Sequence, residues 1–203
     1  MKKLLLGIAA VCLAGFTFAQ DAPLWMRHSV ISPDGTTIAF TYKGDIYTVP
    51  VAGGRAMQIT TNPAYDTAPV WSPDSKRIAF ASDRMGSLDV YIVAKDGGEP
   101  RRLTTHSGSE TPLAFTDAGH VLFSAGIMPS AEAVVFPSNG QFNQVYRVSV
   151  EGGRPTMISS MPMECISINK EGAMLYQDKK GYEDYWRKPV SYTHLRAHET
   201  SLH

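Results

Sequence analysis

Two histidines near the C-terminus have the spacing of a metal site. His194 and His198 lie four residues apart, and Glu199 follows directly. On a helix this spacing would place both imidazoles on one face, and imidazole and carboxylate groups are common zinc ligands. Three interpretations compete: a metal site, an exposed helical tail, and a segment foreign to the protein. The choice among these interpretations depends on the pattern of the residues that precede the pair.

Aspartates recur at matched places and could suggest acid–base chemistry. Asp34 and Asp74 lie in turn-like segments, whereas Asp45, Asp89 and Asp184 each begin a β-like run. A catalytic acid is normally needed once rather than in every repeat. We therefore expect these side chains to hold turns and hairpins through local hydrogen bonds.

The familiar catalytic motifs are missing from the sequence. It has no Gly-x-Ser-x-Gly elbow, Walker-type phosphate loop, His-Glu-x-x-His pair or paired Cys-x-x-Cys spacing. His106 and His120 are isolated, and we expect them in solvent-facing turns. Cys165 lies beside Ile166 and Ile168, so we expect a small buried side chain. The sequence predicts no catalytic, cofactor-binding or metal-binding residue and no cofactor.

The N-terminus has the composition of a secretory signal peptide. Two lysines precede an almost entirely apolar segment, 4–16, and Ala19 supplies a small residue at the end. The apolar stretch is too short to cross a membrane comfortably, and the bulky Val11 disfavours lipid attachment at Cys12. We expect residues 1–19 to be removed by cleavage after Ala19, which gives a periplasmic or secreted protein without stable membrane insertion.

Charge and composition exclude some classes of partner. The 19 basic and 19 acidic residues give a formal net charge of zero, and no basic run stands out. Nucleic acid and anionic membranes therefore gain no electrostatic attraction. Aromatic residues make up 10% of the chain and recur within short β-like runs, which argues against disorder.

A repeat of about 40 residues organises the chain. Residues 31–40 read ISPDGTTIAF and residues 71–80 read WSPDSKRIAF, while two weaker copies begin near 115 and 166. Each unit combines Ser-Pro-Asp turn chemistry or a remnant of it with short β-branched and aromatic runs. Gly-Gly pairs in three of the units suit tight hairpins. About four strands per unit are typical of a β-propeller blade.

The predicted fold is all-β, an incomplete β-propeller with about four blades of four antiparallel strands. We expect the propeller over residues 20–189, with its blades at approximately 25–62, 63–106, 107–160 and 161–189. Trp71 and Phe115 share one repeat position, where we expect them to pack between blades. The fourth unit stops before its Gly-Gly turn. We therefore expect an open ring that is marginally stable, prone to aggregation and inactive on peptides.

The repeat resembles the WD-like propeller repeat of TolB and of tricorn-type peptidases. The similarity covers residues 25 to about 188 and is carried by Ser32-Pro33-Asp34-Gly35, Trp71-Ser72-Pro73-Asp74, Ile38-Ala39-Phe40, Ile78-Ala79-Phe80 and Ser82-Asp83-Arg84. Three features are similar to bacterial tricorn-like serine peptidases in particular. The first blade follows the leader almost directly, the third carries an insertion with Phe136-Pro137-Ser138, and the fourth contains a similar stretch at 178–188.

This resemblance implies the substrate-handling propeller of an exported tricorn-like serine peptidase involved in peptide degradation, with the catalytic domain absent from this chain. A non-catalytic TolB-like periplasmic propeller that binds protein or envelope partners is the alternative, and the propeller of a prolyl-oligopeptidase-like enzyme is a third interpretation. Peptides or a protein would be the partner in each case, and oligomerisation of the intact protein stays open. A downstream domain with a serine nucleophile would distinguish the peptidase from the binder.

The closing residues do not continue the repeat. Residues 190–200 read VSYTHLRAHET, which resembles the translation of a transposase-type sequencing adapter. They supply none of the strand or turn chemistry that the fourth unit lacks. We therefore expect 190–203 to be a non-native tail. An exposed helix is the second interpretation, and a metal site is the third because a terminal segment would lack a supporting shell.

Overall fold

The computed structural model describes residues 25–126, 143–160, 163–169 and 172–178. Several predicted features lie outside these residues: the signal peptide at 1–19, the insertion around Phe136, Asp184, and the tail with its histidine pair. All regular secondary structure in the described part of the chain is β-strand. Within that part no helix is long and apolar enough to cross a membrane.

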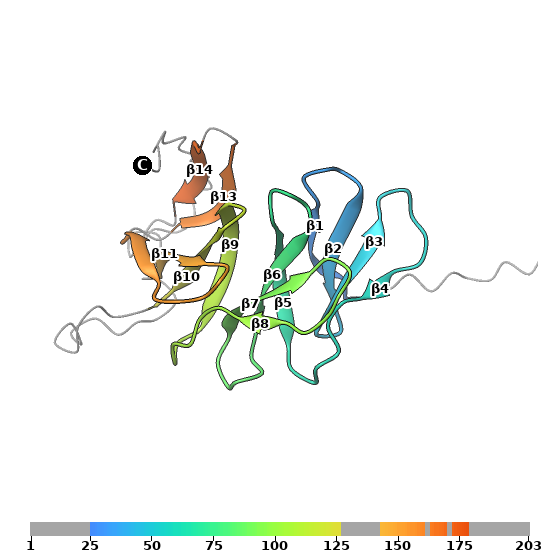
Figure 1. Ribbon diagram of the computed structural model, residues 1–203, viewed down its shortest axis with the longest axis horizontal. Coiled ribbons are helices and arrows are strands. Elements are labelled where there is room, and N and C mark those ends of the chain that lie inside the picture. Colours follow the sequence, from blue (N-terminus) through green and yellow to red (C-terminus); the bar gives the residue numbers. More distant parts are fainter. Residues whose placement is uncertain (1–24, 127–142, 161–162, 170–171, 179–203) are drawn as a thin grey trace, which may run out of the picture.

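The strands form a series of antiparallel sheets in chain order, so the predicted all-β, open-propeller fold is confirmed (Figure 1). The first blade contains β1 (Arg27–Ile31), β2 (Thr37–Tyr42), β3 (Asp45–Pro50) and β4 (Met57–Gln58). The second contains β5 (Asp66–Trp71), β6 (Arg77–Ser82), β7 (Asp89–Ala94) and β8 (Arg101–Arg102).

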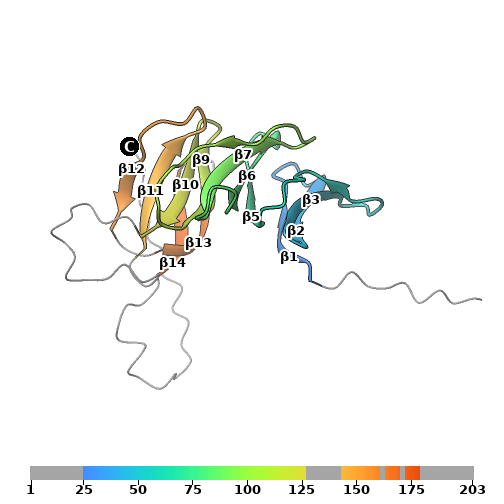
Figure 2. The ribbon, with the colours of Figure 1, turned by 90° about the horizontal axis from the view of Figure 1, so that it is seen from below.

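The third blade contains β9 (Glu110–Asp117), β10 (His120–Ala125), β11 (Gln144–Ser149) and β12 (Thr156–Ser159). A two-stranded sheet of β13 (Met163–Ile168) and β14 (Met174–Asp178) follows it. The blades succeed one another along an arc (Figure 2). The first strand of each later blade packs across the preceding one: β5 contacts β1, β2 and β3, and β9 contacts β5, β6 and β7.

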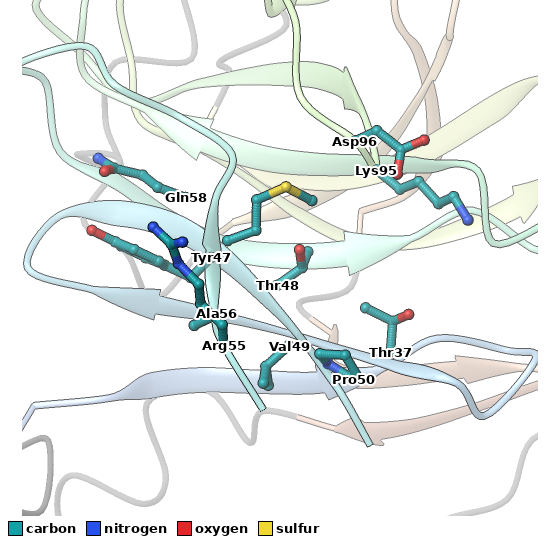
Figure 3. A pocket seen from close by; sticks show the side chains of 11 residues that line it. Thr37, Tyr47, Thr48, Val49, Pro50, Arg55, Ala56, Gln58, Lys95 and Asp96 are labelled. Carbon is teal, nitrogen blue, oxygen red and sulfur yellow. The ribbon is translucent and has the colours of Figure 1, made fainter. Parts of the chain in front are cut away.

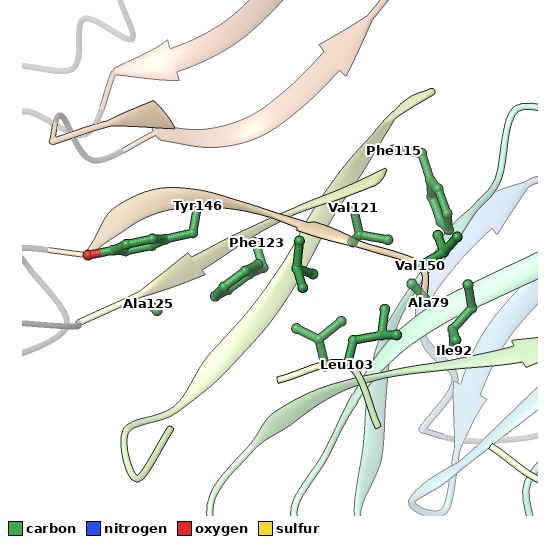
Figure 4. Packing of buried hydrophobic residues seen from close by; sticks show 11 residues of the cluster. Ala79, Ile92, Leu103, Phe115, Val121, Phe123, Ala125, Tyr146 and Val150 are labelled. Carbon is green, nitrogen blue, oxygen red and sulfur yellow. The ribbon is translucent and has the colours of Figure 1, made fainter. Parts of the chain in front are cut away.

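The hydrophobic core lies between the blades. Trp71 packs against Ala39, Ile46 and Ile59 of the first blade, and its indole nitrogen donates a hydrogen bond to the Val30 carbonyl at 3.2 Å. Phe115 belongs to the next layer, in which residues of the third blade face Ala79, Ile92 and Leu103 of the second (Figure 4). The expectation that both aromatic residues pack between blades is confirmed. Burial of these flat apolar faces is the main force that stacks the sheets.

The Gly-Gly pairs form the hairpins expected of them. They connect β3 to β4, β7 to β8 and β11 to β12, and all six glycines have positive φ. In each pair the first glycine donates its backbone N–H to the residue three positions earlier, as Gly97 does to Ala94 at 3.0 Å. Residues with a side chain rarely adopt a positive φ, which is why glycine recurs at these positions.

The first strand of each blade contains a β-bulge. In β1, β5 and β13 the irregular stretch includes a non-glycine residue with positive φ: His28 at 51°, Ala68 at 52° and Cys165 at 50°. Pro112 takes the matching place in β9. Because its ring fixes φ near −65°, the register shift in that strand forms without a positive φ.

The bulge in β13 explains why one expectation is wrong. Cys165 is exposed rather than buried. The extra residue of a bulge changes the alternation of side chains along a strand. Ile166 and Ile168 still pack against the cluster that joins the third blade to β13 and β14, while Cys165, which directly precedes Ile166, is exposed.

Candidate functional site

Buried charge is concentrated at one end of the blades. Because consecutive strands are antiparallel, the start of β5, the end of β6, the start of β7, the end of β8 and the start of β9 all lie at this end. Asp66, Asp89 and Glu110 are located there and have at most 1% of their surface exposed. Burial of carboxylates is costly unless they are paired. The role of each carboxylate therefore depends on the groups around it.

Asp66 is paired with an arginine of the same blade. Arg84 Nη2 lies 3.1 Å from both carboxylate oxygens, and Arg84 Nε donates a hydrogen bond to Ser82 Oγ at 2.8 Å. The guanidinium also lies over the ring of Tyr91, with 4.5 Å between the guanidinium carbon and the ring centroid. An arginine held by Asp66, Ser82 and the Tyr91 ring is a rigid structural element.

A second group of buried charges lies where the second blade meets the third. Arg102 Nη2 lies 2.8 Å from Asp89 Oδ2. The pKa of the neighbouring Glu110 is raised to about 7, chiefly by burial and also by the negative charge of Asp89, while the Thr104 hydroxyl and Arg102 act in the opposite direction. Glu110 is also fixed through its backbone, because its N–H donates to the Leu88 carbonyl at 2.6 Å.

The aspartates that begin strands have a structural place in the first two blades. In the first blade the Thr60 hydroxyl accepts from the Ile46 N–H at 3.0 Å and donates to Asp45 Oδ1 at 3.3 Å. The matching threonine of the second blade accepts from the Val90 N–H at 2.9 Å. Burial raises the pKa of Asp45, and the charge of Asp66 adds to the effect.

The turn aspartates also have the role predicted for them. Asp34 Oδ1 accepts from the Ser32 hydroxyl at 2.5 Å and from the Thr36 N–H at 3.0 Å. Asp74 repeats this pattern with the Ser72 hydroxyl at 2.5 Å and the Lys76 N–H at 3.1 Å. The serine hydrogen bond is the largest of the effects that lower the pKa of each carboxyl. These acids close turns rather than act on a ligand.

His106 and His120 differ from one another. His106 is exposed, and its Nδ1 accepts from the Gly108 N–H at 3.0 Å. His120 begins β10, and its Nδ1 lies 3.1 Å from both carboxylate oxygens of Asp117, so the expectation of an isolated turn residue is wrong for His120. No group of three or more histidine, cysteine, aspartate and glutamate side chains within the described ranges could hold a metal ion.

A cavity of about 740 Å³ lies at the opposite end from the buried charges, between the outer strands of the first blade and the β7–β8 turn of the second (Figure 3). It is lined by Thr37, Tyr47, Thr48, Val49, Pro50, Arg55, Ala56, Met57, Gln58, Lys95 and Asp96. Hydroxyl, amide, carboxylate and basic groups alternate with apolar surface there. This mixture suits a peptide segment better than a small apolar ligand.

The family of tricorn protease N-terminal beta-propeller domains matches residues 23–191. The chain belongs to that family. Tricorn protease homolog 1 of Streptomyces coelicolor (strain ATCC BAA-471 / A3(2) / M145) is 35% identical over 102 residues, or 50% of this chain. The uncharacterized peptidase YuxL of Bacillus subtilis (strain 168) is 30% identical over 129 residues, or 63% of this chain.

The chain spans only a small part of these curated relatives, 9% of the first and 20% of the second. Among solved structures, a putative TolB from Agrobacterium tumefaciens matches 77% of this chain with a TM-score of 0.62 and covers 55% of that protein at 18% identity. The tricorn protease matches 75% of this chain with a TM-score of 0.54, covering 19% of that protein at 12% identity. The tricorn-family propeller thus shares its fold with TolB-type proteins.

Sequence reasoning identified the repeated aspartates and the two interblade aromatics of this tricorn-family propeller. It did not identify Glu110, Asp66, Arg84 or Arg102. Arg84 belongs to the Ser-Asp-Arg stretch, which signalled family membership but gave no indication of its partner. The cavity between the first and second blades, called the rim cavity below, could not be predicted from the sequence, because the residues that line it come from two blades.

Proposed function

We propose that this chain is the propeller portion of an exported tricorn-like serine peptidase, and that it binds peptides that are hydrolysed elsewhere in the intact protein. Support comes from the family match over residues 23–191 and from relatives named as a tricorn protease homolog and a peptidase. The pairing of Asp66 and Asp89 with arginines favours a structural role for these acids and a binding role for the blades.

The proposal includes three assignments along the chain. Residues 1–19 are a leader that is cleaved after Ala19, residues 20–189 are the propeller, and residues 190–203 are a foreign tail. Export can be tested by expression in a bacterial host followed by fractionation and N-terminal sequencing. A periplasmic product that starts at Gln20 supports export, and an uncleaved cytoplasmic product contradicts it.

Peptide handling is tested with two proteins, the 203-residue chain and the product of the intact gene. A library of unstructured peptides is passed over each immobilised protein, and the eluate is analysed by mass spectrometry. We expect the 203-residue chain to retain peptides without cleaving them. The intact product should cleave them and should react with a fluorophosphonate, which labels active serine nucleophiles.

A TolB-like binding protein is the second candidate, favoured by the TM-score of 0.62 to a putative TolB. Under this alternative the intact product retains a folded protein, cleaves no peptide and does not react with the fluorophosphonate. Cleavage of peptides together with fluorophosphonate labelling excludes it.

A further inference from the structure

The repeat offers an internal comparison for the rim cavity. The hydrogen-bonded pairs Thr48–Met57 and Ile92–Arg101 occupy the same place in the first and second blades. Met57 and Arg101 are therefore equivalent positions on the outermost strands. In the same register, Thr37 of β2 corresponds to Arg77 of β6, since each begins the second strand of its blade.

Between the second and third blades, two arginines bridge the rim. Arg101 donates to the Val150 carbonyl through Nη2 and forms an ion pair with Glu151, with 2.9 Å between Nη1 and Oε2. Arg77 donates to the Ala118 carbonyl through its own Nη2. These guanidinium groups connect the outer part of the second blade to the turns of the third.

Between the first and second blades, both bridging arginines are replaced. Their positions are taken by Met57 and Thr37, neither of which carries a cation. The acceptor side is retained, because Asp96 precedes the first glycine of its hairpin just as Glu151 does. The cavity of about 740 Å³ is lined by all three of these residues. It is thus the place that a guanidinium group fills one blade further along.

We propose that the rim cavity binds an arginine side chain of a peptide, whose guanidinium pairs with Asp96 while its aliphatic stem lies along Met57 and Tyr47. This inference rests on the proposed peptide-handling role and narrows it to peptides that contain arginine. The bidentate fit of guanidinium to carboxylate favours arginine over lysine. Arg55 and Lys95 also line the cavity, so an acidic peptide is the competing ligand that the test has to include.

The test uses the full 203-residue chain and three capped tripeptides, in which alanine flanks a central arginine, leucine or glutamate. Binding is measured by calorimetry, and its location by ¹³C-methyl NMR of the Met57 side chain. We expect the arginine peptide to shift the Met57 methyl signal and to bind at least tenfold more tightly than the leucine peptide. We expect Asp96→Asn to remove most of that preference.

Two further variants make the result specific. Glu151→Gln changes the equivalent acid of the next blade, so binding of the arginine peptide should be unchanged. Met57→Arg restores the bridging arginine and should abolish binding by filling the cavity. Tighter binding of the glutamate peptide, or an Asp96→Asn variant that binds as the parent does, overturns the inference. Binding that leaves the Met57 methyl signal unchanged also overturns it, yet peptide handling would stand; failure of all three peptides and of the library to bind would remove the proposed function itself.

Discussion

Arg84 Nη2 lies 3.1 Å from both carboxylate oxygens of Asp66, a side chain with no exposed surface. The two residues belong to the first strand of the second blade and to the loop that follows its second strand. A buried carboxylate of this kind depends on its partner, since the desolvation cost remains when the cation is removed. The pair therefore fixes the end of the second blade at which this loop lies. Both the first and the third blade pack against the second.

Removal of this cation should destabilise the fold strongly. We expect Arg84→Met to lower the free energy of unfolding by about 3–5 kcal/mol, because it leaves the Asp66 charge buried and unpaired. Chemical denaturation followed by tryptophan fluorescence measures the effect. The double variant Asp66→Asn/Arg84→Met should regain much of the loss. A double variant as unstable as the single one would indicate that packing of Arg84 on Tyr91, rather than charge, is decisive.

Glu110 should make stability depend on pH in a defined window. Its pKa is about 7 in the folded protein, against an ordinary value of 4.5. Between these two values the folded state keeps a proton that the unfolded state has lost, so stability falls as the pH rises from 4.5 to 7. The full loss, on the order of 3 kcal/mol, is present above pH 7.

The variant Glu110→Gln tests that assignment. We expect it to be more stable than the parent at pH 8 and similar to it below pH 4.5, because glutamine has no proton to lose. Unfolding in urea at a series of pH values gives the comparison. Glu99→Gln, at an exposed position, is the matched control and should leave the profile unchanged. A parallel profile for Glu110→Gln and the parent would contradict the assignment.

The serine of the Ser-Pro-Asp turn should be as important as its aspartate. Ser72 has no exposed surface, and its Oγ donates to Asp74 at 2.5 Å and accepts from the Arg77 N–H at 2.9 Å. We expect Ser72→Ala to cost about 1–3 kcal/mol, because it leaves the partly buried Arg77 N–H without its acceptor. Ser107→Ala, at an exposed position, should change the free energy of unfolding by less than about 0.5 kcal/mol. Equal values for the two variants would refute this role.

Cys165 should react in the folded protein. It is exposed and is the only cysteine within the described residues. Brief treatment with N-ethylmaleimide without denaturant, followed by intact mass measurement, should show addition at Cys165. A protein that retained its leader would add a second label at Cys12. Labelling of Cys165 only after denaturation would show that the side chain is covered in solution.

Features that depend on neighbours along the chain could be predicted from the amino-acid sequence alone. Turn chemistry placed Asp34 and Asp74, the Gly-Gly pairs located three hairpins, and the spacing of apolar runs indicated blades with Trp71 between them. Each of these rests on local backbone preferences or on a short period. The same regularity led to the wrong expectations for Cys165 and His120. A bulge alters side-chain alternation, and a strand end three residues from Asp117 brings an imidazole to a carboxylate.

The repeat, the strand content and the residue types that close each turn follow from the sequence, because they depend on interactions a few positions apart. Which charges meet is settled only by the tertiary structure. Asp66 and Arg84 are 18 residues apart and Arg101 and Glu151 are 50 apart, so their pairing depends on how strands and blades pack. The same packing leaves the rim between the first and second blades open. There Met57 takes the place of Arg101, and the acid that such an arginine would meet, Asp96, lies in the next blade.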